Sequence, residues 1–104
     1  MENLKSIADE LRARLDETNK VREDALRISR EVVRLSANSI RASHREDFDE
    51  ACELKSLARQ KVEETKQILA DKLEIYHTGY VQDAQKEHAE SELTYAIIRE
   101  LDFP

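Results

Sequence analysis

The sequence predicts an all-α fold, an antiparallel bundle of three long helices. The 104 residues include one glycine and one proline, too few for the turns of a sheet. Apolar residues recur at steps of three and four over long stretches, which is the period of an amphipathic helix. Because 39% of the residues are hydrophobic and 5% aromatic, the core is small and association with other chains is expected. We therefore expect one all-helical unit over residues 1–104.

The first helix is expected over about residues 3–43. Leu4, Ile7, Leu11 and Leu15 begin its apolar face, and a polar segment at residues 16–20 marks a place where the helix would bend or shift phase. The second half carries two apolar stripes with a row of serines between them, and such small side chains let another helix approach closely. The first stripe is Val21, Ala25, Ile28, Val32 and Leu35, the second is Leu26, Val33 and Ile40, and the serines are Ser29, Ser36 and Ser43.

Two further helices are expected over about residues 48–73 and 80–101. Asp47 is the predicted N-cap of the second helix, with Glu50 completing a capping-box-like pattern. The only glycine, Gly79, predicts the break before the third helix. The chain stops at Pro104, a residue that normally ends a helix and starts a linker, so we expect residues 1–104 to be a fragment of a larger helical domain.

Five arginines form a ridge on the first helix. At about 100° per residue they fall within roughly a 60° arc, opposite the first stripe. Residues 20–45 contain seven Lys or Arg against three Asp or Glu, although the whole chain has a net charge of −6. One interpretation is a solvated face with local ion pairs such as Glu23–Arg27 and Glu31–Arg34. The other is a row of guanidinium groups that binds nucleic-acid phosphates. The arginine ridge consists of Arg27, Arg30, Arg34, Arg41 and Arg45.

An acid face is predicted on the third helix. Asp83, Glu87 and Glu90 lie within about 60° of one another, where their like charges repel unless a cation or a basic partner sits among them. Carboxylate oxygens are the ligands that Mg²⁺ prefers, so the three are a candidate metal site of weak affinity. In a chain this rich in glutamate, the alternative is a solvated face whose spacing is accidental.

The remaining reactive side chains favour simpler interpretations. His88 is expected to be a hydrogen-bonded core or interface residue, and His44 and His77 have no partner at zinc-binding spacing. Cys52 is expected to be a small buried residue, and a single cysteine forms no internal disulfide. No signal peptide or apolar run of membrane-spanning length is present, so we expect no membrane association and a cytoplasmic location.

Residues 25–45, ALRISREVVRLSANSIRASHR, resemble the first-helix signature of the translin family. Residues 76–91, YHTGYVQDAQKEHAES, resemble its third-helix region, and the resemblance extends over about residues 20–103. It implies the first half of the translin α-helical fold, oligomers or a translin-like partner subunit, and binding of single-stranded RNA or DNA.

The resemblance is closest to the translin-associated factor X branch. That branch carries a Glu-x-x-Glu pair for metal-dependent RNA cleavage, which Glu87 and Glu90 match. The resemblance thus gives these two residues a catalytic role, with Asp83 as a further metal ligand. The family fold continues for several more helices, which carry a third catalytic carboxylate, so a Mg²⁺-dependent endoribonuclease would need that missing half.

The function expected from the sequence is therefore a translin-like protein that binds single-stranded RNA or DNA. The alternative is a non-enzymatic helical module for oligomerisation or protein interaction, in which the arginine ridge and the acid face bind other protein chains.

Overall fold

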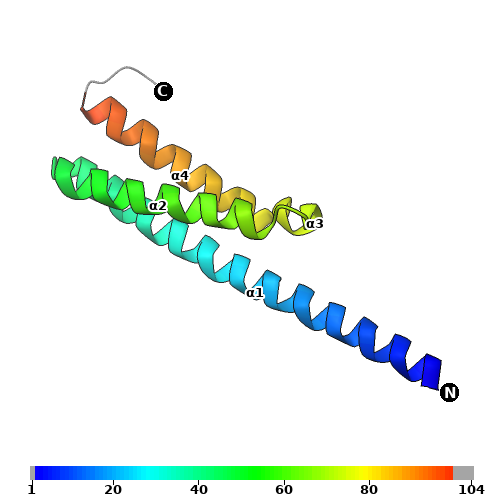
Figure 1. Ribbon diagram of the computed structural model, residues 1–104. Helices are drawn as coiled ribbons and strands as arrows, with labels where there is room; N and C mark the ends of the chain where they lie inside the picture. Colours follow the sequence, from blue (N-terminus) through cyan, green and yellow to red (C-terminus); the bar gives the residue numbers. More distant parts are fainter. Residues whose placement is uncertain (1, 100–104) are drawn as a thin grey trace.

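The computed structural model describes residues 2–99, which form four α-helices and no strand. They are α1 (Glu2–His44), α2 (Phe48–Ile68), α3 (Leu73–Tyr76) and α4 (Gly79–Ile98). The three long helices pack together, with α2 antiparallel to α1 and α4 parallel to it, so the all-α bundle expected from the sequence is confirmed (Figure 1). No helix within the described residues is both long and apolar enough to cross a bilayer.

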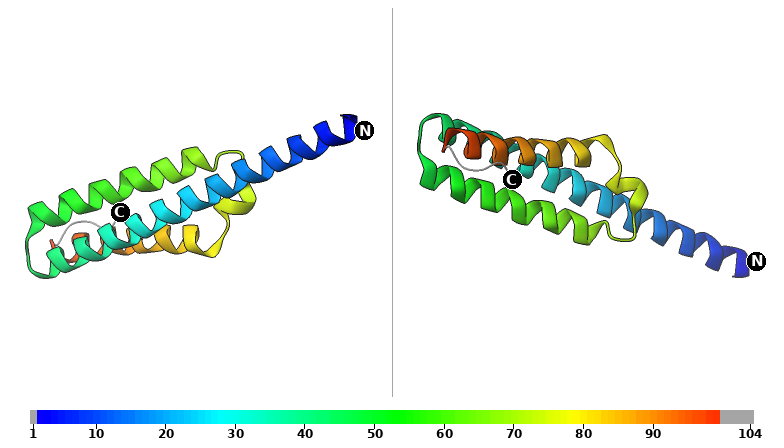
Figure 2. Two further views of the ribbon diagram at one scale, coloured as in Figure 1. Left: turned by 90° about the horizontal axis from the view of Figure 1, so that it is seen from below. Right: turned by 90° about the horizontal axis from the view of Figure 1, so that it is seen from above.

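Helix α1 is about twice as long as its neighbours, and this sets the shape of the molecule. It has 43 residues, against 21 in α2 and 20 in α4. Both shorter helices lie beside its C-terminal half, and residues 2–20, which we name the arm, project beyond them (Figure 2). The molecule is accordingly a rod of 69 × 20 × 17 Å. The helix continues through residues 16–20, so the polar segment there does not interrupt it.

The core lies where α2 and α4 cover α1, and it contains small side chains. Ala25 packs with Leu69, Ile75 and Val81 at the end nearer the arm. Farther along α1, Val32, Val62 and Ala84 form a second cluster. The first stripe of α1 is therefore the core-facing stripe, as its spacing predicted.

The serine row of α1 is buried, as close helix packing requires. Ser29, Ser36 and Ser43 are at most 3% exposed, and their hydroxyl groups have no hydrogen-bond partner among the described residues. Ser39 lies on the same helix and donates a hydrogen bond of 2.8 Å to the carbonyl oxygen of Ala51 on α2. Small side chains at these positions bring the neighbouring backbones close to α1.

The turn from α1 to α2 is a Schellman motif. The amide of Glu46 donates to the Ser43 carbonyl at 3.0 Å, and the amide of Asp47 donates to the Ala42 carbonyl at 2.9 Å. Glu46 has a φ of 61°, the left-handed conformation that this motif needs. Asp47 then caps α2 as predicted, because its carboxylate accepts from the amide of Glu50 at 3.4 Å.

The boundaries of the later helices differ from those predicted. Helix α2 ends at Ile68 instead of residue 73, and the short helix α3 follows after a turn. Leu73, the last residue of the predicted second helix, belongs to α3 instead and is 63% exposed. Gly79 is the first residue of α4, so the break before the third helix is where it was predicted, and the helix starts within one residue of the expected position 80. The predicted end of the third helix at residue 101 lies outside the described residues.

We expect Ile28→Ala to lower the free energy of unfolding by about 2–5 kcal/mol, since Ile28 is fully buried and its loss leaves a cavity. Leu73→Ala is the matched control, because Leu73 is 63% exposed, and its effect should stay below about 1 kcal/mol. Urea unfolding followed by circular dichroism measures both. Equal effects of the two changes would contradict this core.

Candidate nucleic-acid interface

The arginine ridge lies on the exposed surface of α1. All five arginines are exposed, and the helix holds them in one row because it continues without interruption from residue 2 to residue 44. The last one, Arg45, lies just beyond the helix, in the turn before α2. The structure therefore brings the predicted ridge together as a single surface.

Arg27 is held by carboxylates on its own helix. Its guanidinium lies 3.8 Å from Asp24 and 3.4 Å from Glu31. The expected pairs were Glu23–Arg27 and Glu31–Arg34, and neither is among the ion pairs of the described residues. Arg27 pairs with Asp24 instead of Glu23, and Glu31 pairs with Arg27 instead of Arg34.

Glu31 also connects the ridge to α2. One carboxylate oxygen lies 3.2 Å from Nζ of Lys61 on α2. The pKa of Glu31 is held below its usual value, chiefly by the hydrogen bond from Lys61, while partial burial opposes the shift and Arg27 adds to it. Glu31 thus stays ionised and neutralises the arm end of the ridge.

The C-terminal end of the ridge is also partly engaged. Arg41 donates a hydrogen bond of 2.8 Å to Oδ1 of Asn38, and Arg45 lies 3.1 Å from Glu50. This leaves Arg30 and Arg34, which have no ion pair and no side-chain hydrogen bond to any of residues 2–99. The middle of the ridge therefore holds two unneutralised guanidinium groups one turn apart.

The acid face lies on α4. Asp83 and Glu90 are exposed, and Glu87 is half-buried. Across residues 2–99 no three His, Cys, Asp or Glu side chains are arranged so that they could hold a metal ion. The metal role of the acid face therefore stays a prediction.

A cluster of charges that sequence reasoning missed joins α2 to α4. Glu92 accepts hydrogen bonds from Lys55 at 3.0 Å and from Arg59, both on α2. The side chains of Lys55 and Glu92 are only 12% and 20% exposed. Burial raises the pKa of Glu92, but the hydrogen bonds and the positive charges of Arg59 and Lys55 together lower it more, and the net result is a pKa below the usual value. No local spacing could have revealed this cluster, because Lys55 and Arg59 are 37 and 33 residues from Glu92 in the sequence.

Aromatic rings surround the cationic side of this cluster. The Lys55 ammonium lies 4.4 Å from the centre of the Tyr95 ring, and Phe48 meets Tyr95 edge to face at 6.1 Å. The Arg99 guanidinium covers Phe48 at 4.6 Å. Cation–π contacts of this kind fasten the end of α4 to the start of α2.

His88 belongs to the same cluster. Its Nε2 is buried and lies 3.3 Å from Oε1 of Glu92, without the geometry of a hydrogen bond. Burial lowers the pKa of His88, and the opposing attraction of Glu92 only partly offsets this. The expectation of an interface residue is met, whereas the expected hydrogen bond is not formed.

Cys52 differs from its expectation. It is exposed on α2, one residue after the fully buried Ala51, so the core-facing stripe of α2 passes beside it. His44 and His77 are exposed as well.

Comparison of the chain with models of protein families, with curated proteins and with solved structures finds no match.

We expect Glu92→Gln to reduce the free energy of unfolding by about 1–3 kcal/mol near pH 7, because Lys55 and Arg59 lose their anionic partner. Since the folded-state pKa of Glu92 is lowered, its stabilisation is present above the unfolded pKa of about 4.3 and is lost as pH falls through the folded value. The difference between wild type and variant should therefore shrink in acid. Glu63→Gln, at an exposed pair with Lys66, is the control. Denaturant unfolding over a pH series measures this, and a difference that stays constant into acid would contradict it.

Proposed function

We propose that this protein binds single-stranded RNA or DNA through the arginine ridge. The observation that carries the proposal is the pair Arg30 and Arg34, the two exposed ridge arginines that have neither an ion pair nor a side-chain hydrogen bond within residues 2–99. A planar guanidinium forms two parallel hydrogen bonds to a phosphate, so free arginines at regular spacing suit a polyanion.

The geometry of the ridge supports a strand lying along α1. From Arg27 to Arg41 the ridge extends about 21 Å at 1.5 Å per residue, on a rigid helix whose opposite face is fixed in the core. The side chains are thus held in a row before a ligand arrives. Because the rest of the chain is acidic, with a net charge of −6, we expect binding to be local and modest in affinity.

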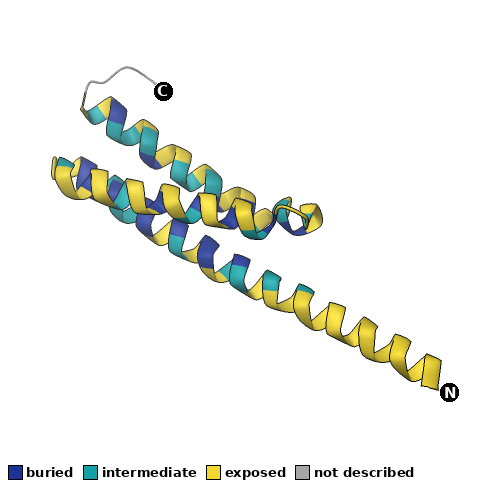
Figure 3. Cartoon of the chain, in the orientation of Figure 1, coloured by how far each residue is buried: buried dark blue, intermediate teal, exposed yellow. Residues whose placement is uncertain are grey.

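An interaction module is the second candidate, and one observation favours it. Leu4, Ile7, Leu11 and Leu15 are 54–69% exposed on the arm, where no other helix lies beside them (Figure 3). A row of exposed leucine and isoleucine side chains is more typical of a docking surface than of a solvated helix. The two functions use different faces of α1 and can be tested separately.

The Arg30→Glu, Arg34→Glu double variant should bind single-stranded RNA of mixed sequence more weakly, and its salt slope should fall by about 0.7 per lost contact. Lys66→Glu with Lys86→Glu is the matched control, because it makes the same change in net charge at exposed sites on α2 and α4. Fluorescence anisotropy at several salt concentrations measures the affinities. If both double variants bind RNA as wild type does, the ridge is not the binding surface.

For the acid face we expect weak Mg²⁺ binding and little or no RNA cleavage by residues 1–104 alone, since too few ligands are present. The measurement is single-stranded RNA cleavage in Mg²⁺ or Mn²⁺ by the wild type and by Glu87→Gln. Cleavage that Glu87→Gln abolishes would contradict this expectation and assign chemistry to the Glu87–Glu90 pair.

A further inference from the structure

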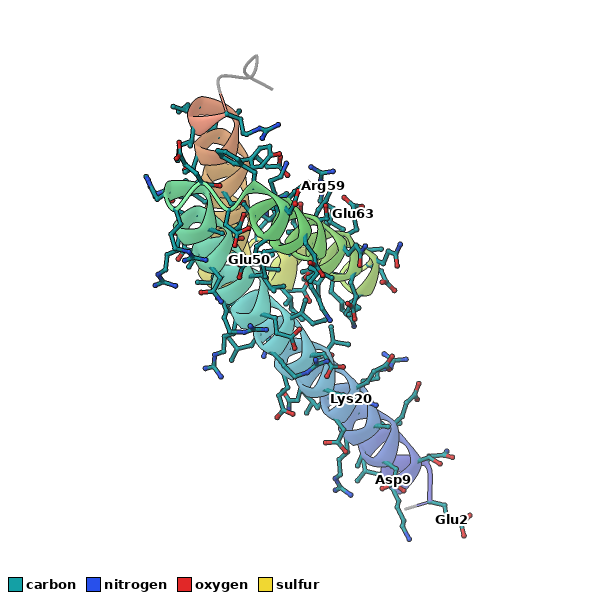
Figure 4. All side chains as sticks on the ribbon, turned by 90° about the vertical axis from the view of Figure 1, so that its left-hand side faces the viewer. Glu2, Asp9, Lys20, Glu50, Arg59 and Glu63 are labelled. Carbon is teal, nitrogen blue, oxygen red and sulfur yellow. The ribbon has the colours of Figure 1, made fainter. Side chains whose placement is uncertain are left out.

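A groove opens between α1 and α4 beside the arginine ridge. It encloses about 290 Å³, close to the lower end of the range of about 300–1,000 Å³ that is typical of small-molecule pockets, so it suits one compact group. No second helix lies beside the arm, whose length Glu2, Asp9 and Lys20 mark in Figure 4, so the groove is confined to the body of the bundle. Its lining residues are Leu26, Ser29, Arg30, Val33, Tyr80 and Asp83.

An apolar wall and an aromatic ring line this groove. Leu26 and Val33 are seven residues apart on α1, so both lie on one side of the helix. Tyr80 comes from the first turn of α4 and is half-buried, because it packs against the core cluster around Ala25. The core therefore fixes the ring before a ligand arrives, and a flat group can stack on it.

Two opposite charges also line the groove, and they do not pair with each other. Arg30 comes from α1, and Asp83 comes from α4, three residues after Tyr80 on the same face. Neither forms an ion pair or a side-chain hydrogen bond within residues 2–99. The Asp83 carboxylate repels a phosphate but accepts a hydrogen bond from an N–H group, whereas the Arg30 guanidinium does the reverse. The groove is therefore suited to a ligand with an anionic end at Arg30 and a neutral, hydrogen-donating end at Asp83.

Arg30 connects this groove to the ridge. A second groove on α1 shares Leu26 and Arg30 with the first, and its lining residues are Glu23, Leu26, Arg27, Arg30, Glu31 and Arg34. A phosphate bound by Arg30 and Arg34 therefore lies at the edge of the groove between α1 and α4. The base of the same nucleotide can enter that groove.

We propose that the groove between α1 and α4 holds one base of a single-stranded nucleic acid. Tyr80 stacks on the face of the base, and Asp83 accepts a hydrogen bond from its edge. This rests on the proposed function, because the phosphate of the same strand is bound at Arg30.

The charge of Asp83 determines which bases the groove prefers. Cytosine carries an exocyclic amino group, from which a carboxylate accepts a hydrogen bond. Uracil carries a carbonyl oxygen at the same position, which a carboxylate repels. The groove therefore selects bases with an amino group on the Watson–Crick edge. Asp83 then recognises a base, a role separate from the metal ligation predicted for it.

The test compares oligocytidine with oligouridine of equal length by fluorescence anisotropy at neutral pH. The two carry the same phosphates, so binding through the ridge alone gives equal affinities. Wild type should bind oligocytidine at least about threefold more tightly. Asp83→Asn should bring the ratio to about one, because an amide can donate to uracil as well as accept from cytosine. Asp83 is exposed, so this variant keeps the fold. Glu53→Gln makes the same change in charge at an exposed site on α2 and should keep the wild-type ratio.

Tyr80→Leu tests the stacking contact. It should weaken oligocytidine binding by at least about fivefold, since stacking of one base on an aromatic ring contributes about 1–3 kcal/mol. The salt slope should stay as in wild type, because no phosphate contact is lost. Circular dichroism checks the fold of this variant, since Tyr80 also packs against the core.

Equal affinity of wild type for the two oligomers would overturn the proposal, and so would a preference that survives Asp83→Asn. In either case the ridge remains the binding surface if both oligomers bind with a salt slope that Arg30→Glu with Arg34→Glu lowers. If neither oligomer binds wild type, the proposed function itself fails, and the base site fails with it.

Discussion

The close approach of α2 and α4 to α1 is the contact on which the rest of the structure depends. It is possible because the core-facing side of α1 carries alanine and serine where larger side chains would hold the helices apart. Ala25, Ala42, Ser36 and Ser43 are fully buried. The hydroxyl groups of Ser36 and Ser43 have no partner in the part of the chain that the structure describes, a cost that tight packing must offset. Such packing places the small core on one side of α1 and leaves its other sides available.

Helix α1 then presents three different faces around its axis. One side is buried along the body, where the core clusters lie. A second side carries the arginine ridge, and a third carries the exposed Leu4, Leu11 and Leu15 of the arm. The charge cluster around Glu92 has a different role, because it fastens α2 to α4 and reaches neither the ridge nor the arm.

What the sequence predicted well was set by local periodicity. The steps of three and four in α1 predicted both its helical state and its core-facing stripe, since one helix repeats the same environment along its length. The N-cap at Asp47 was also local, because a carboxylate three residues before Glu50 accepts its amide. The Arg30–Arg34 part of the candidate interface followed from the same spacing.

What the sequence did not predict depends on contacts between distant residues. The end of α2 at Ile68 is set by Leu69 turning into the core beside Ile75 and Val81, a contact that no pattern within α2 contains. The break before α4, by contrast, lies where Gly79 predicted it. Glu92 looked like one more surface acid, and only the packing of α4 on α2 places it between Lys55 and Arg59.

The central claim is that α1 is held by α2 and α4 along residues 25–43 and stands free of them along residues 2–20. Hydrogen exchange along α1 measures this most directly. The account predicts slow exchange of the amides of residues 25–43 and much faster exchange of those of residues 2–20. Arm amides that exchange as slowly as those of residues 25–43 would contradict it.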